Sequence, residues 1–212
     1  MAASAVQAVL LVVISWQVAV DGPLLGVDRW VRHAVHAARH WLSSPLLNHL
    51  GAALSDLGGS VPALPVLLGG GALAAWRARG AGFRRWWLPV PVAMVTAGLI
   101  PLLVVPAKAW FARPGPFGLP LGPDQWGWYP SGHTATATIA YGAAALLLGR
   151  TAGERARRLL YGGAALLAFG VGLGLVWSDY HWLLDVLASW CVGGLLLTAL
   201  SRLPARVLPH RL

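Results

Sequence analysis

Three short polar segments interrupt a chain that is 57% apolar and only 11% charged. They begin at Lys108, Tyr129 and Trp177 and read KAWFARPGP, YPSGHT and WSDYHWLLD. Ionisable side chains are costly next to long apolar stretches, so those that occur there are candidates for function. The residue types point to the binding and transfer of an anionic group such as phosphate.

The third segment combines a histidine with a carboxylate. His181 and Asp185 are four residues apart, which on a helix places them on one face, one turn apart. A carboxylate on one imidazole nitrogen fixes the tautomer and makes the other nitrogen a better base or nucleophile. The alternative is a structural pair that closes a helix start. Asp179 is either an interfacial charge or part of the pocket wall.

The second segment has the residues of a helix start, followed by a histidine. Ser131 is a preferred N-cap residue, and the free N–H groups of a first helical turn favour an anion such as phosphate. His133 lies in that turn, from which it could donate a proton to a leaving oxygen. The alternative is a capped helix with an interfacial histidine.

The first segment supplies positive charge. Arg113 suits bidentate recognition of an oxyanion, whereas Lys108 acts as a point charge. Lys108 could instead extend its ammonium from a span end into the interface. It is the only lysine in a chain that otherwise uses arginine, which favours a specific role.

Membrane helices must position these segments, and each needs about 20 mostly apolar residues. The expected spans are residues 5–20, 61–76, 87–108, 133–148, 159–177 and 183–200. The first could be a signal peptide, but it lacks a positive start and a clear cleavage site. Residues 27–42 are too polar to span and predict an amphipathic interfacial helix. The expected fold class is therefore all-α, a polytopic membrane bundle of six transmembrane helices plus this interfacial helix, with residues 1–212 forming one membrane-embedded domain.

The net charge of +9 is unevenly distributed along this layout. With a cytoplasmic N-terminus, the inner loops and tail contain Arg77, Arg79, Arg84, Arg85, Arg150, Glu154, Arg155, Arg157, Arg158, Arg202, Arg206 and Arg211. The outer segments contain Asp21, Asp28, Arg29, Arg32, Arg39, Asp56, Lys108, Arg113, Asp124, Asp179 and Asp185. This bias follows the positive-inside rule. We therefore expect a multi-pass protein of the cell membrane with cytoplasmic N- and C-termini and an extracytoplasmic active site. Nucleic-acid binding is not needed to explain the basic excess.

The residues do not suggest a metal or a cofactor. Cys191 is the only cysteine, which excludes an internal disulfide and a cysteine zinc site. His33, His36 and His40 lack a carboxylate or cysteine at ligand spacing. We expect neither a metal nor a cofactor, and the sequence does not specify an oligomeric state.

Together, the three segments resemble the type 2 phosphatidic acid phosphatase superfamily of membrane lipid phosphate phosphatases. The family pattern is K-x6-R-P, then P-S-G-H, then S-R-x5-H-x3-D. Lys108, the run from Pro130 to His133, and the pair His181 and Asp185 match it. Two family arginines are missing, because Gly115 and Leu175 stand at their positions. Arg113 lies two residues before the first of these.

The resemblance implies a mechanism without metal. His181 would form a phosphohistidine, Asp185 would orient it, and His133 would protonate the leaving oxygen. The phosphate would be bound by Lys108, Arg113, Ser131 and Gly132.

The family also suggests the substrate class. We expect a lipid phosphate, first a polyprenyl (di)phosphate such as undecaprenyl diphosphate of the bacterial cell envelope. Phosphatidylglycerol phosphate, phosphatidic acid and prenyl-linked sugar phosphates are alternatives. Two other functions remain open: a phosphotransferase or cyclase-like enzyme that uses the same lipids, and a non-hydrolytic membrane protein that binds prenyl phosphates.

Overall fold

The computed structural model describes residues 2–118, 120–122 and 125–203, and its regular elements within these ranges are all helices. They are α1 (Ala2–Ala19), α2 (Leu25–Leu42), α3 (Pro45–Asp56), α4 (Ser60–Gly80), α5 (Pro89–Phe111), α6 (Gly132–Gly149), α7 (Glu154–Trp177) and α8 (Leu183–Ser201). Asp124, Arg206 and Arg211, which enter the predicted charge distribution, lie outside the described residues. The all-α prediction is confirmed for the described part.

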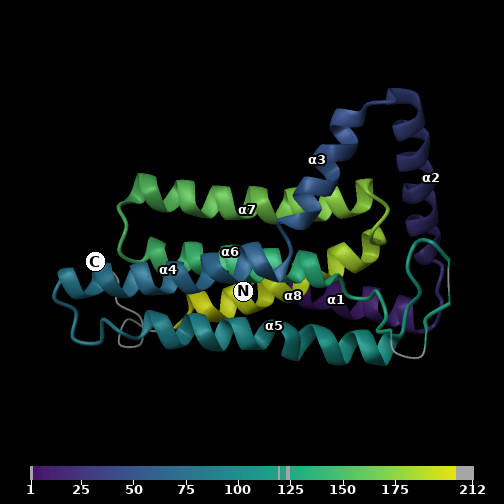
Figure 1. Cartoon of the computed structure of the whole chain (residues 1–212). Helices are drawn as coiled ribbons and strands as arrows, with labels where there is room; N and C mark the ends of the chain where they lie inside the picture. The colour runs from purple at the N-terminus through teal and green to yellow at the C-terminus, as the bar shows by residue number, and fades with distance from the viewer. Residues whose placement is uncertain (1, 119, 123–124, 204–212) are drawn as a thin grey trace.

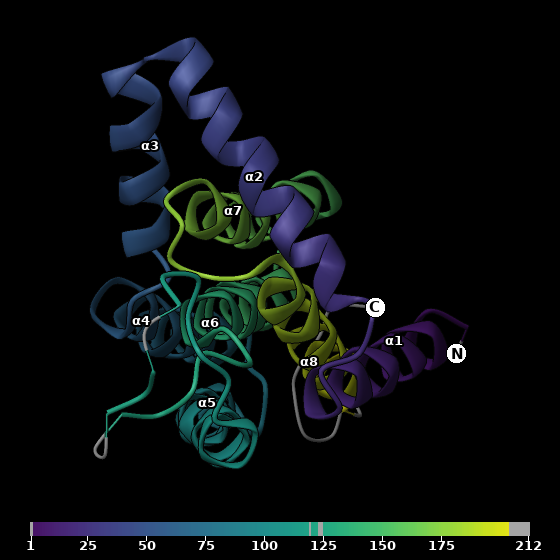
Figure 2. The same ribbon diagram turned by 90° about the vertical axis from the view of Figure 1, so that its right-hand side faces the viewer.

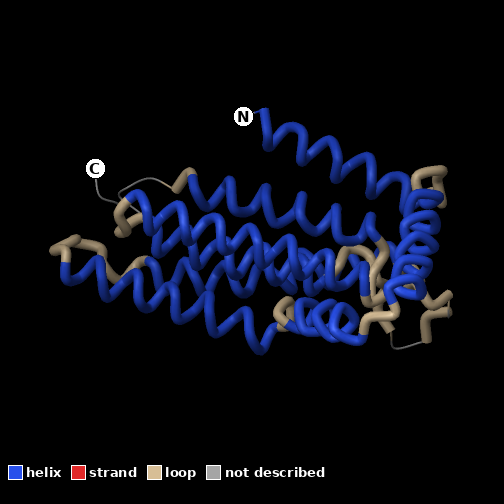
Figure 3. Tube along the Cα trace, turned by 90° about the horizontal axis from the view of Figure 1, so that it is seen from above, coloured by secondary structure: helices blue, strands red, loops and turns tan. Residues whose placement is uncertain are grey.

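Helix α6 forms the centre of the bundle (Figures 1 and 2). Helices α4, α5, α7 and α8 surround it and contact it, while α1 packs against α8 at the periphery. The core between these helices is built from small and branched residues, among them Leu67, Ala137, Ile139 and Val171, all fully buried. The loops gather at the two ends of the bundle, so side chains on different loops of one end can meet (Figure 3).

Within the described residues, five helices are long and apolar enough to cross a membrane: α1, α4, α5, α7 and α8. The expected span 133–148 corresponds to α6, which is not among them. Because α6 is enclosed by other helices, it does not need an apolar surface toward lipid, and its buried positions include Thr134 and Thr136. Five of the six expected spans are therefore long and apolar enough to cross a membrane, and the crossing by α6 stays a prediction.

The predicted interfacial helix exists as α2, and it turns into a second helix that the sequence analysis did not identify. Helix α3 begins at the N-cap Ser44, whose hydroxyl accepts a hydrogen bond from Leu47 N at 3.4 Å, with Pro45 in its first turn. The α2–α3 hairpin lies at one end of the bundle and across its axis (Figure 1). Trp30 and Trp41 on α2 are 69% and 82% exposed, as expected for a helix that rests in a lipid interface.

Close glycine contacts fix α3 on α7. A Cβ added at Gly174 would lie 2.6 Å from the Gly51 carbonyl oxygen, and one added at Gly51 would lie 2.6 Å from Trp177 Cδ1. No side chain fits between the two backbones, so α3 and α7 approach as closely as small-residue contacts allow. This packing holds the α2–α3 hairpin beside the α7–α8 turn.

Candidate active site

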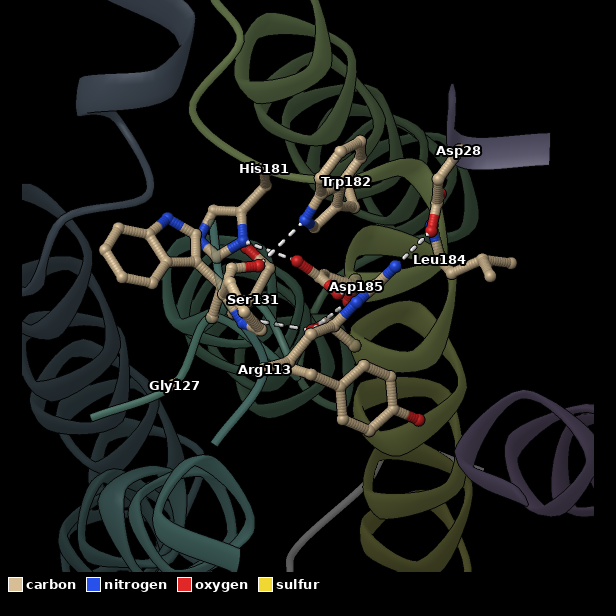
Figure 4. A network of polar contacts seen from close by, with 12 residues as sticks. Asp28, Arg113, Gly127, Ser131, His181, Trp182, Leu184 and Asp185 are labelled. Atoms are coloured by element: carbon tan, nitrogen blue, oxygen red, sulfur yellow. Dashed lines mark hydrogen bonds and ion pairs between the residues drawn. The ribbon is translucent and has the colours of Figure 1, made fainter. Parts of the chain in front are cut away.

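The three polar segments of the sequence come together at the bundle end that carries α2 (Figures 1 and 4). Backbone hydrogen bonds join them. Gly127 N donates to Lys108 O at 3.2 Å, Trp128 N to Arg113 O at 2.8 Å, and Ser131 N to Asp185 O at 3.2 Å. The connection from α5 to α6 is therefore tied both to the end of α5 and to the first turn of α8.

His181 and Asp185 form the pair that their spacing predicts. His181 Nδ1 lies 3.2 Å from Asp185 Oδ2; the carboxylate is fully buried and the histidine is 9% exposed. Burial is the main cause that lowers the pKa of His181, and Asp185 opposes it. With Nδ1 on the carboxylate, Nε2 has no hydrogen-bond partner among the described residues. The imidazole is thus oriented, mostly neutral near pH 7, and has one free nitrogen.

The start of α6 is capped as predicted. Ser131 Oγ accepts a hydrogen bond from Thr134 N at 3.3 Å, and the Ser131 side chain is fully buried. Ser189 Oγ lies 2.9 Å from Ser131 O and 2.8 Å from Asp185 O, which binds the cap to α8. The N–H groups of Gly132 and His133 have no acceptor among the described residues. Free N–H groups at a helix start favour an anion, so the predicted phosphate site would lie here.

Lys108 lies beside this helix start. Its Nζ donates to Gly127 O at 2.9 Å and to Trp128 O at 3.2 Å. A Cβ added at Gly132 would lie 3.6 Å from Lys108 Cε, so the lysine stem passes directly over Gly132. An ammonium has three donors, and two of them hold the connecting segment in place. One remains for a ligand.

Arg113, which was expected to bind the phosphate, has two carboxylate partners in the structure. It is 7% exposed; Nη1 lies 2.5 Å from Asp185 Oδ1 and Nη2 lies 2.5 Å from Asp28 Oδ2 (Figure 4). Its guanidinium also lies 5.4 Å from the centre of the Trp182 ring. Arg113 therefore joins two carboxylates, and its contact with a phosphate stays a prediction.

Asp28 is the site residue that the sequence analysis missed. It was grouped with the other outer charges, but on the exposed helix α2 it is only 2% exposed. Its Oδ1 accepts from Leu184 N at 2.9 Å, which caps the first turn of α8 from another helix. In the sequence, the one hint is an acidic residue in the first turn of an otherwise basic amphipathic segment.

His133 is exposed in the first turn of α6, on the side of α3. A Cβ added at Gly58 would lie 2.8 Å from His133 Cβ, so the α3–α4 turn packs closely against it. His181 and Lys108 are among the titratable groups that act on it. The structure thus brings His133 and His181 to the same end of the bundle, one exposed and one buried.

Asp179 belongs to the wall of the site end. Arg32 Nε and Nη2 donate to its carboxylate at 2.9 and 3.0 Å, and His36 Nε2 lies 3.1 Å from it. Burial raises the pKa of Asp179, but the hydrogen bonds from Arg32 and His36 outweigh it and hold the pKa below its usual value. Helix α2 is in this way bound to the turn that carries His181.

The family arginines are missing at Gly115 and Leu175, and neither position has room for an arginine unless neighbouring groups move. A Cβ added at Gly115 would lie 2.7 Å from the Trp128 ring, so the indole occupies the space of a side chain. Leu175 is 2% exposed in α7, and its carbonyl accepts from the N–H groups of Tyr180 and His181 at 2.9 and 3.3 Å. Neither position brings a cation to the site.

A small apolar cavity lies next to the second segment. Its volume is about 180 Å³, and it is lined by Ser15 of α1, Val104 and Phe111 of α5, and Tyr129 and Pro130. The Tyr129 hydroxyl lies 2.7 Å from Ser15 Oγ. Burial is the main cause that raises the pKa of Tyr129, to about 12. The phenol therefore stays neutral and leaves the cavity apolar.

The described residues contain no group of three or more His, Cys, Asp or Glu side chains that could hold a metal ion. His33 and His40 do not join His36 on Asp179 in any hydrogen bond of the described part. The expectation of a site without metal stays a prediction.

Comparison with known proteins places these observations in a family. The family model "PAP2 superfamily" matches residues 86–208, which is more than half of the chain. The crystal structure of the first transmembrane PAP2-type phosphatidylglycerolphosphate phosphatase from Bacillus subtilis superposes with a TM-score of 0.77 at 24% identity, covering 95% of either chain. Curated protein sequences give no match. The chain therefore belongs to the PAP2 superfamily, the integral membrane lipid phosphate phosphatases.

Proposed function

We propose that the protein removes phosphate from a lipid phosphate through a phosphohistidine on His181. The observation that carries this proposal is the buried His181–Asp185 pair, at 3.2 Å, at the bundle end where α6 begins. It combines an oriented imidazole with an anion-binding helix end, and phosphoryl transfer needs both. The PAP2 family consists of metal-independent phosphomonoester hydrolases, which agrees with these roles.

In the first step, the lone pair of His181 Nε2 attacks phosphorus. The bond from phosphorus to the lipid oxygen breaks, and its electron pair stays on that oxygen. His133, in its protonated form, gives a proton to this oxygen, so that the lipid leaves as an alcohol or, from a diphosphate, as a monophosphate. Asp185 accepts the Nδ1–H of His181 and stabilises the positive charge that forms on the ring.

In the second step, water attacks the phosphohistidine. His133, now neutral, takes a proton from the water, the bond from phosphorus to nitrogen breaks, and its electrons return to His181. Phosphate leaves, and both histidines regain their starting forms. One exposed and one buried histidine suit these roles, because the proton carrier needs access to water and the nucleophile does not.

Four residues contribute to phosphate binding in this proposal. Lys108 uses its third N–H, and Gly132 uses its backbone N–H at the start of α6. Arg113 has five N–H donors, of which the carboxylates engage two, and it adds positive charge. Ser131, which is fully buried, contributes by capping the helix that binds the anion.

We propose a polyprenyl (di)phosphate as the first substrate candidate, with its headgroup at the extracytoplasmic side. The apolar cavity beside Tyr129 would take the part of the chain nearest the phosphate. The basic loops at the opposite end would face the cytoplasm, together with both termini, and α6 would cross the cell membrane with the five apolar helices. The chain would then form one membrane-embedded domain. Phosphatidylglycerol phosphate is the second candidate, because the similar solved structure is that of a phosphatidylglycerolphosphate phosphatase.

The test is phosphate release in detergent with EDTA, from undecaprenyl diphosphate, phosphatidylglycerol phosphate and phosphatidic acid. We expect release from at least one lipid by the wild type and none above background by His181→Ala. Acid-labile ³²P on the wild-type protein, absent from His181→Ala, identifies the intermediate. Equal release by both proteins contradicts the proposal.

The missing cations at Gly115 and Leu175 favour one alternative, a non-hydrolytic membrane protein that binds a prenyl phosphate lipid. A second alternative is a phosphotransferase, which passes the phosphoryl group to an acceptor other than water. It would form the same ³²P-labelled protein. Mass spectrometry of the products with candidate alcohols present distinguishes it, because a transferase yields a phosphorylated alcohol. Labelled protein also argues against a non-hydrolytic binding protein.

A further inference from the structure

We infer that Asp28, on the interfacial helix α2, is a positioning residue for the nucleophile His181. This inference rests on the proposed function. Asp28 lies outside residues 86–208, which the family model matches, and on a helix whose composition suggests membrane contact alone. Helix α2 would then complete the site as well as rest on the lipid surface.

The contacts of Asp28 are divided between the two parts of the site that must stay aligned. Oδ1 accepts from Leu184 N at 2.9 Å, and Oδ2 lies 2.5 Å from Arg113 Nη2. The first contact holds the helix that carries Asp185. The second holds the arginine that binds the same Asp185 through Nη1 at 2.5 Å.

These contacts form a chain from α2 to the imidazole ring of His181. Asp28 fixes Arg113, Arg113 fixes one oxygen of Asp185, and the other oxygen of Asp185 lies on His181 Nδ1 (Figure 4). Each of these side chains is less than 10% exposed. Buried charges stay in place only when each has a partner, so loss of Asp28 leaves Arg113 with one carboxylate and freedom to move.

The charge of Asp28 matters as well as its position. Arg113 counteracts the effect of Asp185 on His181, because it is positive and lies on the same carboxylate. Asp28 neutralises Arg113, so that Asp185 keeps its full effect on the imidazole. Without the charge of Asp28, the surroundings of His181 become more positive and its protonated form becomes less stable.

The other charged groups near His181 do not replace Asp28. Those that face it come from α5, the α5–α6 connection, α6 and α8, and they are Lys108, Arg113, His133 and Asp185. In the α7–α8 turn, Asp179 is occupied by Arg32 and His36 of α2. Asp28 and Asp185 are thus the two carboxylates on Arg113 within the described residues.

The experiment compares Asp28→Asn, Asp28→Ala and the matched control Asp21→Asn, an exposed aspartate just before α2. Asp28→Asn keeps an oxygen for Leu184 N but loses the charge on Arg113, whereas Asp28→Ala loses both. With the lipid that the wild type hydrolyses fastest, we expect kcat to fall about 10-fold or more in Asp28→Asn, with KM changed less than threefold. Asp21→Asn should match the wild type. The amount of ³²P-labelled protein corrects each rate for the fraction of intact sites.

A second readout does not need turnover. In ¹⁵N-histidine NMR, with the His181 signal identified by its loss in His181→Gln, we expect Asp28→Asn to lower the pKa of His181 by about 0.5 or more. A residue that only caps α8 would leave this pKa unchanged in Asp28→Asn and would reduce activity only in Asp28→Ala. That pattern overturns the inference, as does an unchanged kcat in Asp28→Asn. If His181→Ala stays active, the proposed function fails, while the NMR result still decides the position of Asp28.

Discussion

Arg113 at one end of the bundle and Arg77 and Arg79 at the other end differ in exposure and in partners. Arg113 is 7% exposed and lies between Asp28 and Asp185 at 2.5 Å each. Arg77 and Arg79 are exposed beside a cavity of about 760 Å³, and the Arg79 guanidinium lies 5.1 Å from the Trp86 ring centre. This cavity is larger than the one beside Tyr129. It lies at the opposite end of the bundle from His133 and His181.

The difference follows from desolvation. An exposed arginine keeps water or lipid headgroups around it, so a single partner changes its free energy little. A buried arginine needs charged partners with good geometry, and removing one of them is costly. We therefore expect the basic end to tolerate substitution, whereas the site end should depend on each member of the network.

The largest effect is expected for Asp185→Asn, at the centre of the buried network. An amide still fits, but it no longer stabilises the imidazolium and no longer balances Arg113. We expect kcat to fall by about 10³-fold or more. Phosphate release measures it, with Asp21→Asn as control. Activity within 10-fold of the wild type would show that the pair is structural.

The next largest effect is expected for Arg113→Gln, which leaves two buried carboxylates without their shared cation. We expect a loss of about 3–5 kcal/mol in the free energy of unfolding, and a lower kcat. Thermal unfolding in detergent measures stability. The matched change at the other end, Arg79→Gln, should leave it unchanged. Equal melting temperatures of Arg113→Gln and Arg79→Gln would contradict the difference in stability that we expect between the two ends.

The pH dependence sharpens the comparison within the site end. His181 attacks in its neutral form, and burial lowers its pKa below the ordinary value, so neutral His181 persists as the pH falls through that value. The acid limb of kcat/KM that His181 controls should therefore lie below about pH 6.5, with about a tenfold loss per pH unit beneath it. A pH–rate profile of the wild type measures it. An acid limb above pH 7 controlled by His181 would contradict this environment.

The smallest effect is expected for Arg77→Gln and Arg79→Gln at the basic end. Both side chains are exposed and lie away from the reacting groups, so kcat in detergent should stay within about twofold of the wild type. The same two variants can shift the orientation of the protein in the membrane, which cysteine labelling from either side detects. A tenfold loss of kcat in detergent would mean that the two ends are coupled.

Local rules were sufficient for several features. Ser131 caps α6 because its side chain and the N–H that it binds are three residues apart. His181 meets Asp185 because a helical turn brings residues four apart together. The interfacial helix α2 follows from its polar and apolar faces. Each of these three features depends on a short stretch of chain, so it can be predicted from the sequence alone.

Other features depend on packing between distant segments. Asp28 and Arg113 are 85 residues apart, and nothing local distinguishes Asp28 from the other outer charges. Helix α6 is not among the five candidate spans, and its enclosed position depends on the helices around it. Helix α3 has a local start signal in Ser44 and Pro45, but its place on α7 depends on the contact between Gly51 and Gly174.

By itself, the sequence determined the helical class, the membrane environment and the pairing of His181 with Asp185, because hydropathy and helical spacing act over one or two turns. The tertiary structure decided which charges share a partner. It showed that Arg113 links two carboxylates, Asp28 and Asp185, and it brought Asp28 into the site. The physical reason is burial: a charge removed from water must find its partner wherever the fold provides one, at any distance along the chain.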